Sequence, residues 1–236
     1  MSSKRSREVE QYWKDLGIDP IAVTVNHKTG YTLRAYRMSD TLPNWSGNLS
    51  DPPVSDEPED ESNPEPQDID FSANDAEPEE VPVMLVRKGE LLLFEEPEAL
   101  VDYVKANDGN QLDWLDEYEE LQKTLTVEHI APAEEDEYEL SGVVSELRRG
   151  TWKTEDLIAA GEFSRDAAYV LDLDSVTEAL DPGSPLDVFD NFLRDSLNGG
   201  LRGMRAKRRI KRQPTEQTAI AWRAVISKIS ERIQWG

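Results

Sequence analysis

A proline-rich acidic stretch in the first half of the chain is the feature that most constrains its fold. Residues 51–80 contain thirteen acidic residues and six prolines but few apolar side chains. Proline interrupts helices and sheet ladders, like charges repel, and so little apolar surface cannot offset the entropy lost on ordering. We therefore expect a disordered acidic insert over residues 38–80, acting either as a solvated linker or as a docking segment for a partner.

The segments on either side of this insert are expected to form one split α+β domain, made of residues 1–37 and 81–148. Its first element is a helix over Glu8–Leu16, whose apolar residues recur at helical spacing and which Gly17 is placed to end. If the two segments share one sheet, the ends of the insert lie close together at the sheet edge.

Strand patterns predict a small antiparallel sheet of about four strands in this split domain. Residues 20–26 and 31–37 alternate or are rich in β-branched residues, and a turn signal separates them. Residues 81–87 and 90–94 repeat the pattern around a Lys-Gly turn. A helix that begins at Pro97 follows and is expected to cover one face of the sheet.

The remainder of the chain changes to helical patterns. Residues 149–197 are expected to form a helical section that packs on the sheet domain, because so short a section cannot hold a large core of its own. Within it, Ser184 and Pro185 form a helix-start signal. We expect a basic linker over residues 198–215 and an amphipathic C-terminal helix over residues 216–236.

Composition limits the chemistry that the chain can perform. The chain contains no cysteine, which excludes disulfides, cysteine nucleophiles, thiolate zinc sites and iron–sulfur clusters. Neither of its two histidines, His27 and His129, has a second histidine at ligand spacing, and we expect no metal or other cofactor. No phosphate-binding glycine loop, nucleophile elbow or convergent acid–base pair is present, so we expect a protein that is not an enzyme.

Charge is divided unevenly along the chain, whose net charge is −23. Residues 201–236 carry ten basic and two acidic residues, so this tail has the opposite sign to the rest. The tail can fold back on the acidic body, hold a protein partner, or bind DNA or RNA through its phosphates. The candidate residues for partner or nucleic-acid binding are Arg202, Arg205, Lys207, Arg208, Arg209, Lys211 and Arg212.

Apolar residues recur at intervals of four, three and four in the C-terminal segment, which is the spacing of one helix face. Such a face can dock on its own domain, on a second copy of the chain, or on another protein. The residues of this expected partner-helix face are Trp222, Ile226, Ile229 and Ile233.

Several stretches resemble the C-terminal half of an uncharacterised actinobacterial family whose members often carry the label "primosomal protein". They are residues 12–20, residues 31–36, the hairpin at residues 86–94 with the helix start that follows it, and residues 138–142. The resemblance implies a cytosolic acidic protein built of sheet–helix modules and an acidic linker, and it transfers no functional residue.

These observations together predict a non-catalytic acidic adaptor or regulatory protein of the actinobacterial cytoplasm. It would bind a protein partner through the acidic insert, the basic amphipathic tail, or both, and self-association is a further possibility. The alternative is an accessory factor that associates with DNA, RNA or a replication or transcription machine through residues 202–212. No window is apolar for the roughly 18 residues of a membrane span, and the N-terminus lacks a signal-peptide pattern, so we expect no membrane contact.

Overall fold

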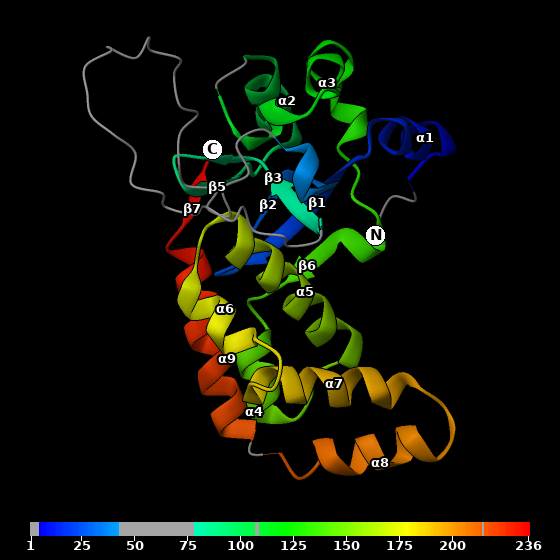
Figure 1. The fold of residues 1–236 in the computed structure, drawn as a ribbon, viewed down its shortest axis with the longest axis vertical. Helices are drawn as coiled ribbons and strands as arrows, with labels where there is room; N and C mark the ends of the chain where they lie inside the picture. The colour runs from blue at the N-terminus through cyan, green and yellow to red at the C-terminus, as the bar shows by residue number, and fades with distance from the viewer. Residues whose placement is uncertain (1–4, 43–77, 107–108, 214) are drawn as a thin grey trace, which may run out of the picture.

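The computed structural model describes residues 5–42, 78–106, 109–213 and 215–236 (Figure 1). Within these ranges the chain is an α+β protein, which confirms the predicted fold class. Most of the expected insert, residues 43–77, lies outside the described residues. Its two described ends meet, because the Ser39 amide donates to the Glu79 carbonyl at 2.8 Å, as expected for an insert that leaves and rejoins one sheet edge.

Two small sheets contain all the strands of the described residues. The first has the order β3-β2-β1-β6, with β1–β2 and β2–β3 antiparallel and β1–β6 parallel. The second has the order β4-β5-β7, with β4–β5 antiparallel and β5–β7 parallel. The strands are β1 (Ile18–Val25), β2 (Lys28–Met38), β3 (Glu80–Met84), β4 (Val86–Arg87), β5 (Glu90–Leu93), β6 (Glu137–Glu139) and β7 (Ile233–Trp235).

The expected single meander of four strands is therefore two sheets, and the change occurs at Leu85. The Leu85 amide donates to Leu33 of the first sheet at 3.3 Å, while its carbonyl accepts from Leu92 of the second at 3.0 Å. The two sheets approach closely at Gly30, where a Cβ atom would lie 2.8 Å from the Trp235 ring and 2.9 Å from the Leu93 side chain. Glycine is thus required there for packing rather than for its backbone angles.

The described residues contain nine α-helices, and the helices before β6 and those after it lie on opposite sides of the first sheet (Figure 1). Gly17 ends the first helix and Ser184 caps the seventh directly before Pro185, both as expected, and Ser6 caps the start of the first helix. The helices are α1 (Arg7–Leu16), α2 (Pro97–Ala106), α3 (Tyr118–Thr124), α4 (Val143–Arg149), α5 (Thr154–Val170), α6 (Asp174–Leu180), α7 (Pro185–Leu197), α8 (Gly200–Ile210) and α9 (Thr215–Ser230).

The first sheet separates two hydrophobic cores. On one face, Leu33 and Ala35 of β2 pack with the buried side chains of α1, α2 and α3, including Trp13. On the other face, Ile21 and Val23 of β1 pack with α4 to α7 and α9. Ile18 of the same strand packs in the core of α1, α2 and α3, so β1 contributes side chains to both cores. The helical section packs on the sheet, in agreement with the sequence.

The tail differs from its expected form in two places. Residues 198–215, expected as a basic linker, contain helix α8 at Gly200–Ile210. The C-terminal helix ends at Ser230, and Ile233–Trp235 form β7, which pairs with β5. The parallel strand β7 was missed because three residues are too few to show an alternation.

Candidate functional site

Five of the seven residues of the predicted basic cluster lie on α8, the lowest helix in Figure 1, which packs on α7, and Lys211 and Arg212 follow its end. Gly203, Ala206 and Ile210 form the buried face of α8. A Cβ atom at residue 203 would collide with the backbone carbonyl oxygen of Asn198, so glycine allows the two helices to approach closely. Small side chains thus hold α8 against α7, and we call these two helices the α7–α8 arm.

The opposite side of α8 combines cations with exposed apolar side chains. Leu201, Met204, Arg205 and Arg208 lie at positions i, i+3, i+4 and i+7 and form what we call the outer face of α8. Leu201 is 68% exposed and Met204 is 53% exposed. Leu197, at the end of α7, is 54% exposed and extends the apolar surface of the arm.

Most cations of the cluster have no acidic partner among the described residues. Arg202 pairs with Asp195 at 2.8 Å, and the Arg209 guanidinium lies over the ring of Phe192. The remaining members, which make no ion pair with any described residue, are Arg205, Lys207, Arg208, Lys211 and Arg212. The structure therefore places the cluster on α8 and the two residues after it, and leaves most of its charge without an acidic partner among the described residues.

The expected partner-helix face is used inside the molecule instead. Trp222 is 4% exposed and Ile229 is fully buried, both in the core that α9 shares with the other helices. Ile226 is 9% exposed, and Ile233 lies in β7 rather than on a helix. Of the three docking alternatives for this face, the structure shows the first, docking on its own domain. Trp222 and Ile229 are therefore covered and do not present a surface to a partner.

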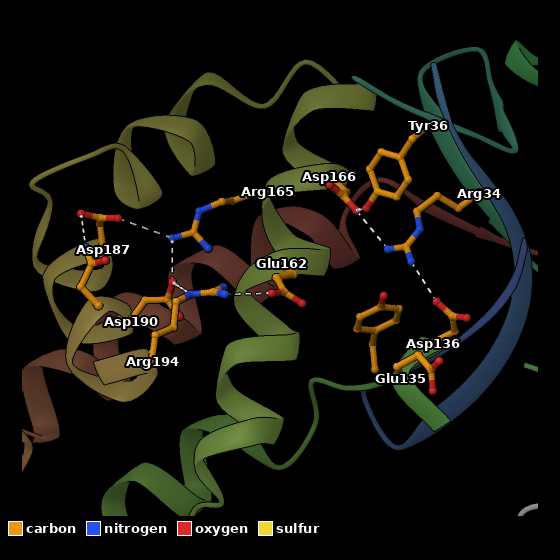
Figure 2. A pocket seen from close by; sticks show the side chains of 12 residues that line it. Arg34, Tyr36, Glu135, Asp136, Glu162, Arg165, Asp166, Asp187, Asp190 and Arg194 are labelled. Carbon is orange, nitrogen blue, oxygen red and sulfur yellow. Dashed lines mark hydrogen bonds and ion pairs between the residues drawn. The ribbon is translucent and has the colours of Figure 1, made fainter. Parts of the chain in front are cut away.

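A polar cleft of about 560 Å³ lies between β2, the segment before β6, and helices α5 and α7 (Figure 2). On its sheet side, the Arg34 guanidinium donates to Asp136 at 2.9 Å and to Asp166 at 3.1 Å. The Tyr36 hydroxyl donates to the same Asp166 oxygen at 2.6 Å. The buried Arg34 guanidinium thus pairs with two carboxylates, which come from different elements.

Burial dominates the electrostatics of this sheet-side group. Desolvation raises the pKa of Asp136 to about 6, although the neighbouring Arg34 opposes the shift. Desolvation likewise raises the pKa of Asp166, against the hydrogen bond from Tyr36 and the charge of Arg34. Burial also raises the pKa of Tyr36. The group is short of positive charge, because two carboxylates share one guanidinium.

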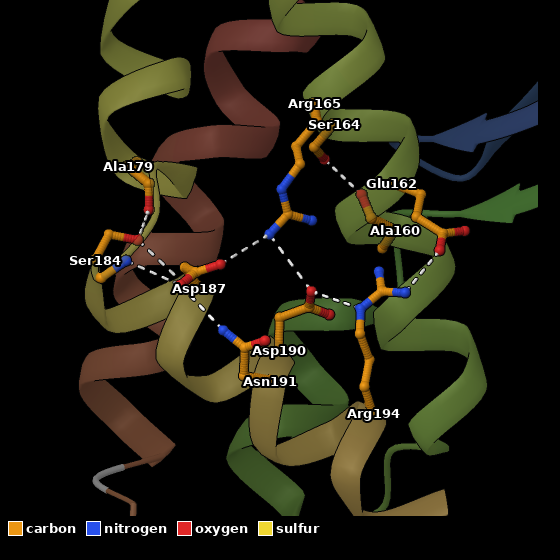
Figure 3. A network of polar contacts seen from close by, with 11 residues as sticks. Ala160, Glu162, Ser164, Arg165, Ala179, Ser184, Asp187, Asp190, Asn191 and Arg194 are labelled. Carbon is orange, nitrogen blue, oxygen red and sulfur yellow. Dashed lines mark hydrogen bonds and ion pairs between the residues drawn. The ribbon is translucent and has the colours of Figure 1, made fainter. Parts of the chain in front are cut away.

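The helix side of the cleft is a second ion-pair network, which joins α5 to α7 (Figure 3). Arg165 of α5 contacts Asp190 at 3.4 Å and Asp187 at 3.8 Å. Arg194 of α7 donates to Asp190 at 2.9 Å and to Glu162 at 3.0 Å. Apart from Glu135, the guanidiniums and carboxylates of the cleft are thus paired with one another, an arrangement that fixes helix positions. Among the described residues no cluster of acidic or histidine side chains is arranged to hold a metal.

Comparison with known proteins gives a family for this chain. A family model described as the SatS C-terminal domain matches residues 75–230. The chain belongs to this family. Among solved structures, "The crystal structure of SatS c-terminal domain in complex with bromine" has a TM-score of 0.64 and 19% sequence identity, and the likeness covers 98% of each chain. At this identity the likeness concerns the fold, and no curated protein matches the chain.

The part matched to the SatS C-terminal domain family includes the whole α7–α8 arm but excludes Arg34 and Tyr36 of the cleft. In the described part of the chain, every helix is too short or too polar to cross a membrane. This match does not test the predicted resemblance to proteins labelled "primosomal protein", which stays a prediction.

Sequence reasoning missed the cleft because its members are far apart in the chain. Arg34 and Asp136 are separated by 102 residues, and Arg34 and Asp166 by 132. One signal was available: an arginine in a strand whose neighbouring strand is apolar needs a buried partner. The identity of that partner, in a chain with 49 acidic residues, was beyond the reach of spacing.

Proposed function

We propose that this chain is a non-catalytic adaptor of the cytoplasm that holds a protein partner on its α7–α8 arm. The observation that carries the proposal is the outer face of α8, where exposed Leu201 and Met204 stand beside cations without acidic partners. Protein interfaces combine apolar contact with arginine in this way. The paired charges of the polar cleft support a structural role for that cleft rather than a reactive one.

The chemistry of the outer face suggests an acidic, amphipathic partner segment. Arg205 and Arg208 can form forked hydrogen bonds to carboxylates, while Leu201 and Met204 supply the apolar contact that such a segment would bury. The positive arm on a chain of net charge −23 also orients the encounter, because the remainder of the surface repels an acidic partner. A docking role for the acidic insert concerns residues outside those described.

The second candidate function is an accessory factor that touches DNA, RNA, or a replication or transcription machine. It is favoured by the concentration of cations in residues 202–212, which could displace counterions from phosphates. The overall negative charge opposes it, since most of the surface would repel a phosphate backbone. Exposed leucine and methionine between the arginines also add nothing to phosphate binding, so the protein partner is the better explanation.

A capture experiment with matched variants separates these two functions. Arg205→Glu/Arg208→Glu reverses two charges on the arm, and Lys14→Glu/Lys105→Glu makes the same change on exposed residues of α1 and α2. We expect the arm variant to lose a nuclease-resistant protein partner that wild type and control retain. Since all four sites are exposed, unfolding free energies should stay within about 0.5 kcal/mol of wild type.

A third variant, Leu201→Ser/Met204→Ser, distinguishes protein from nucleic acid. A protein partner needs the apolar contact and would be lost, whereas phosphate binding would survive with its steep salt dependence. Capture that disappears with nuclease and ignores the apolar variant would replace the adaptor with the nucleic-acid factor. Truncation before α8 is unsuitable here, because it would also remove Trp222 and Ile229 from the core.

A further inference from the structure

A second concave site lies on a different side of the helical section, away from the polar cleft. It is a groove of about 400 Å³ between the β1–β2 turn, the start of α4 and the side of α9. Leu140, Val144 and Ile226 give it an apolar lining, and basic and hydroxyl side chains line the remainder. None of its ten lining residues, all of them described, carries a carboxylate, although the chain has 49 acidic residues.

The two arginines of the groove differ in whether they have an acidic partner among the described residues. Arg148 donates through Nε and Nη2 to Glu216 at 2.9 to 3.2 Å, so much of its charge is used. Arg223 is exposed and makes no hydrogen bond or ion pair with any described residue. One uncommitted guanidinium therefore lies beside an apolar lining, and this matches a ligand with one negative charge.

The β1–β2 turn places His27 at the groove in a strained backbone conformation. Asn26 and His27 both have positive φ, 53° and 62°, as a two-residue hairpin turn of type I′ requires. Glycine is the usual second residue of this turn, because other side chains are strained there. The His27 amide donates to the Ser141 hydroxyl at 2.8 Å, which ties the turn to the segment before α4. The turn thus holds an imidazole at the groove.

We infer that this groove binds a carboxylate attached to a small aliphatic body. The carboxylate would face Arg223 and His27, and the aliphatic part would lie against Leu140, Val144 and Ile226. A singly charged group fits better than a phosphate dianion, because one free guanidinium must compete with a net charge of −23. The volume suits a few residues of peptide or a small acid. This inference is independent of the proposed role of the α7–α8 arm.

Two sources can supply this chemistry, a free peptide C-terminus and a small carboxylic acid. The test uses N-acetyl-Ala-Leu-Ala-Leu with a free carboxyl end, the same peptide as its amide, and 4-methylpentanoate, each added to the full chain at constant pH. Imidazole resonances in a carbon–proton NMR spectrum report binding directly. The chain has two histidines, and His129, which stacks on Tyr12 outside the groove, serves as an internal control.

We expect the free-acid peptide to shift the His27 resonances in a saturable way while those of His129 stay in place. Arg223→Gln should weaken this affinity at least about tenfold, the usual loss for a hydrogen bond to a charged group. Arg149→Gln, a change at another exposed arginine, on α4 outside the groove, should bind as wild type. Saturation by 4-methylpentanoate with equal affinity assigns the site to small acids, and saturation by the peptide alone assigns it to peptide ends.

Three results would overturn the inference. The first is an amide peptide that shifts His27 as strongly as the free acid, since the carboxylate would then play no part. The second is unchanged affinity in Arg223→Gln. The third is the absence of any His27 shift up to the solubility limit of both acids.

Discussion

Helices α8 and α9 follow one another in the chain, yet they contribute to the molecule in opposite ways. α9 places large side chains inward, and Trp222, Val225 and Ile229 are almost wholly buried among other helices. α8 faces inward with Gly203, Ala206 and Ile210 and turns its long side chains to solvent. Buried apolar area stabilises a fold, whereas exposed long side chains contribute little to it. Helix α9 therefore stabilises the fold, whereas α8 leaves its long side chains exposed on the surface.

The largest effect expected from this contrast is at Trp222. Trp222→Ala removes a large side chain that is 4% exposed and should lower the free energy of unfolding by about 3–5 kcal/mol. The matched change Leu201→Ala, at a residue 68% exposed on α8, should cost under about 0.5 kcal/mol. Urea denaturation followed by fluorescence and circular dichroism measures both.

Equal losses in these two variants would contradict the contrast, since α8 would then be part of the core. A small loss for Trp222→Ala would instead mean that α9 docks loosely and that its apolar face can be released to a partner. Circular dichroism of the folded baseline checks that each variant retains its helices before unfolding is measured.

Local signals and distant contacts explain what the sequence could predict here. Gly17, Ser184 and Pro185 act within one turn of their own helix, and their predicted roles agree with the structure. A helical stripe likewise predicted that residues 222, 226 and 229 share a face, but a stripe does not say what covers it. The cover is a set of helices packed from the same chain, which only the tertiary fold reveals.

The candidate sites were harder to predict than the helices for a physical reason. The basic cluster was visible because its members are adjacent in sequence. The exposed Leu201 and Met204 beside it were not predicted. Their exposure depends on which face of α8 packs against α7, and the tertiary fold decides this. The contacts of Arg34 with Asp136 and Asp166 depend on β-sheet pairing and on the packing of α5 on the sheet, so sequence spacing could not predict them.

The contrast between apolar and charged contacts can also be tested inside the fold, at Asp136. Its folded pKa is raised to about 6 from an ordinary value of 3.8, so the folded state favours the protonated form. The associated stability is fully present below about pH 3.8 and is lost as pH rises through about 6. Asp136→Asn resembles the protonated form and avoids this loss. Relative to wild type, it should therefore gain on the order of 2 kcal/mol between pH 4 and pH 7.5.

Chemical denaturation of both proteins at several pH values checks this sign. Glu134→Gln, which removes an exposed carboxylate from the same segment outside the cleft, is the control for a general change in charge. A difference that moves in favour of wild type as pH rises would show that the attraction of Arg34 outweighs desolvation. The ion pair would then stabilise the fold as the apolar contacts of α9 do.

The smallest effect expected is at Gly203, which tests whether α8 is held by close approach alone. Alanine at a helix interior position normally gains about 1 kcal/mol over glycine. Here its Cβ would collide with the Asn198 carbonyl, and overpacking costs about 1–3 kcal/mol. Gly203→Ala should therefore lose about 1 kcal/mol overall and loosen α8, which trypsin detects as faster cleavage at the arginines of residues 202–212.

Gly199→Ala provides the control for this last change, because a Cβ atom there meets no atom within 4 Å and its φ of −70° suits alanine. Alanine is a poorer N-cap than glycine, so this change can cost up to about 1 kcal/mol, but it should leave trypsin cleavage of α8 unchanged. If Gly203→Ala were as stable as wild type and equally resistant, the arm would be able to separate slightly from α7 without loss. The outer face of α8 would then be carried by an adjustable helix, and partners of more than one shape could bind it.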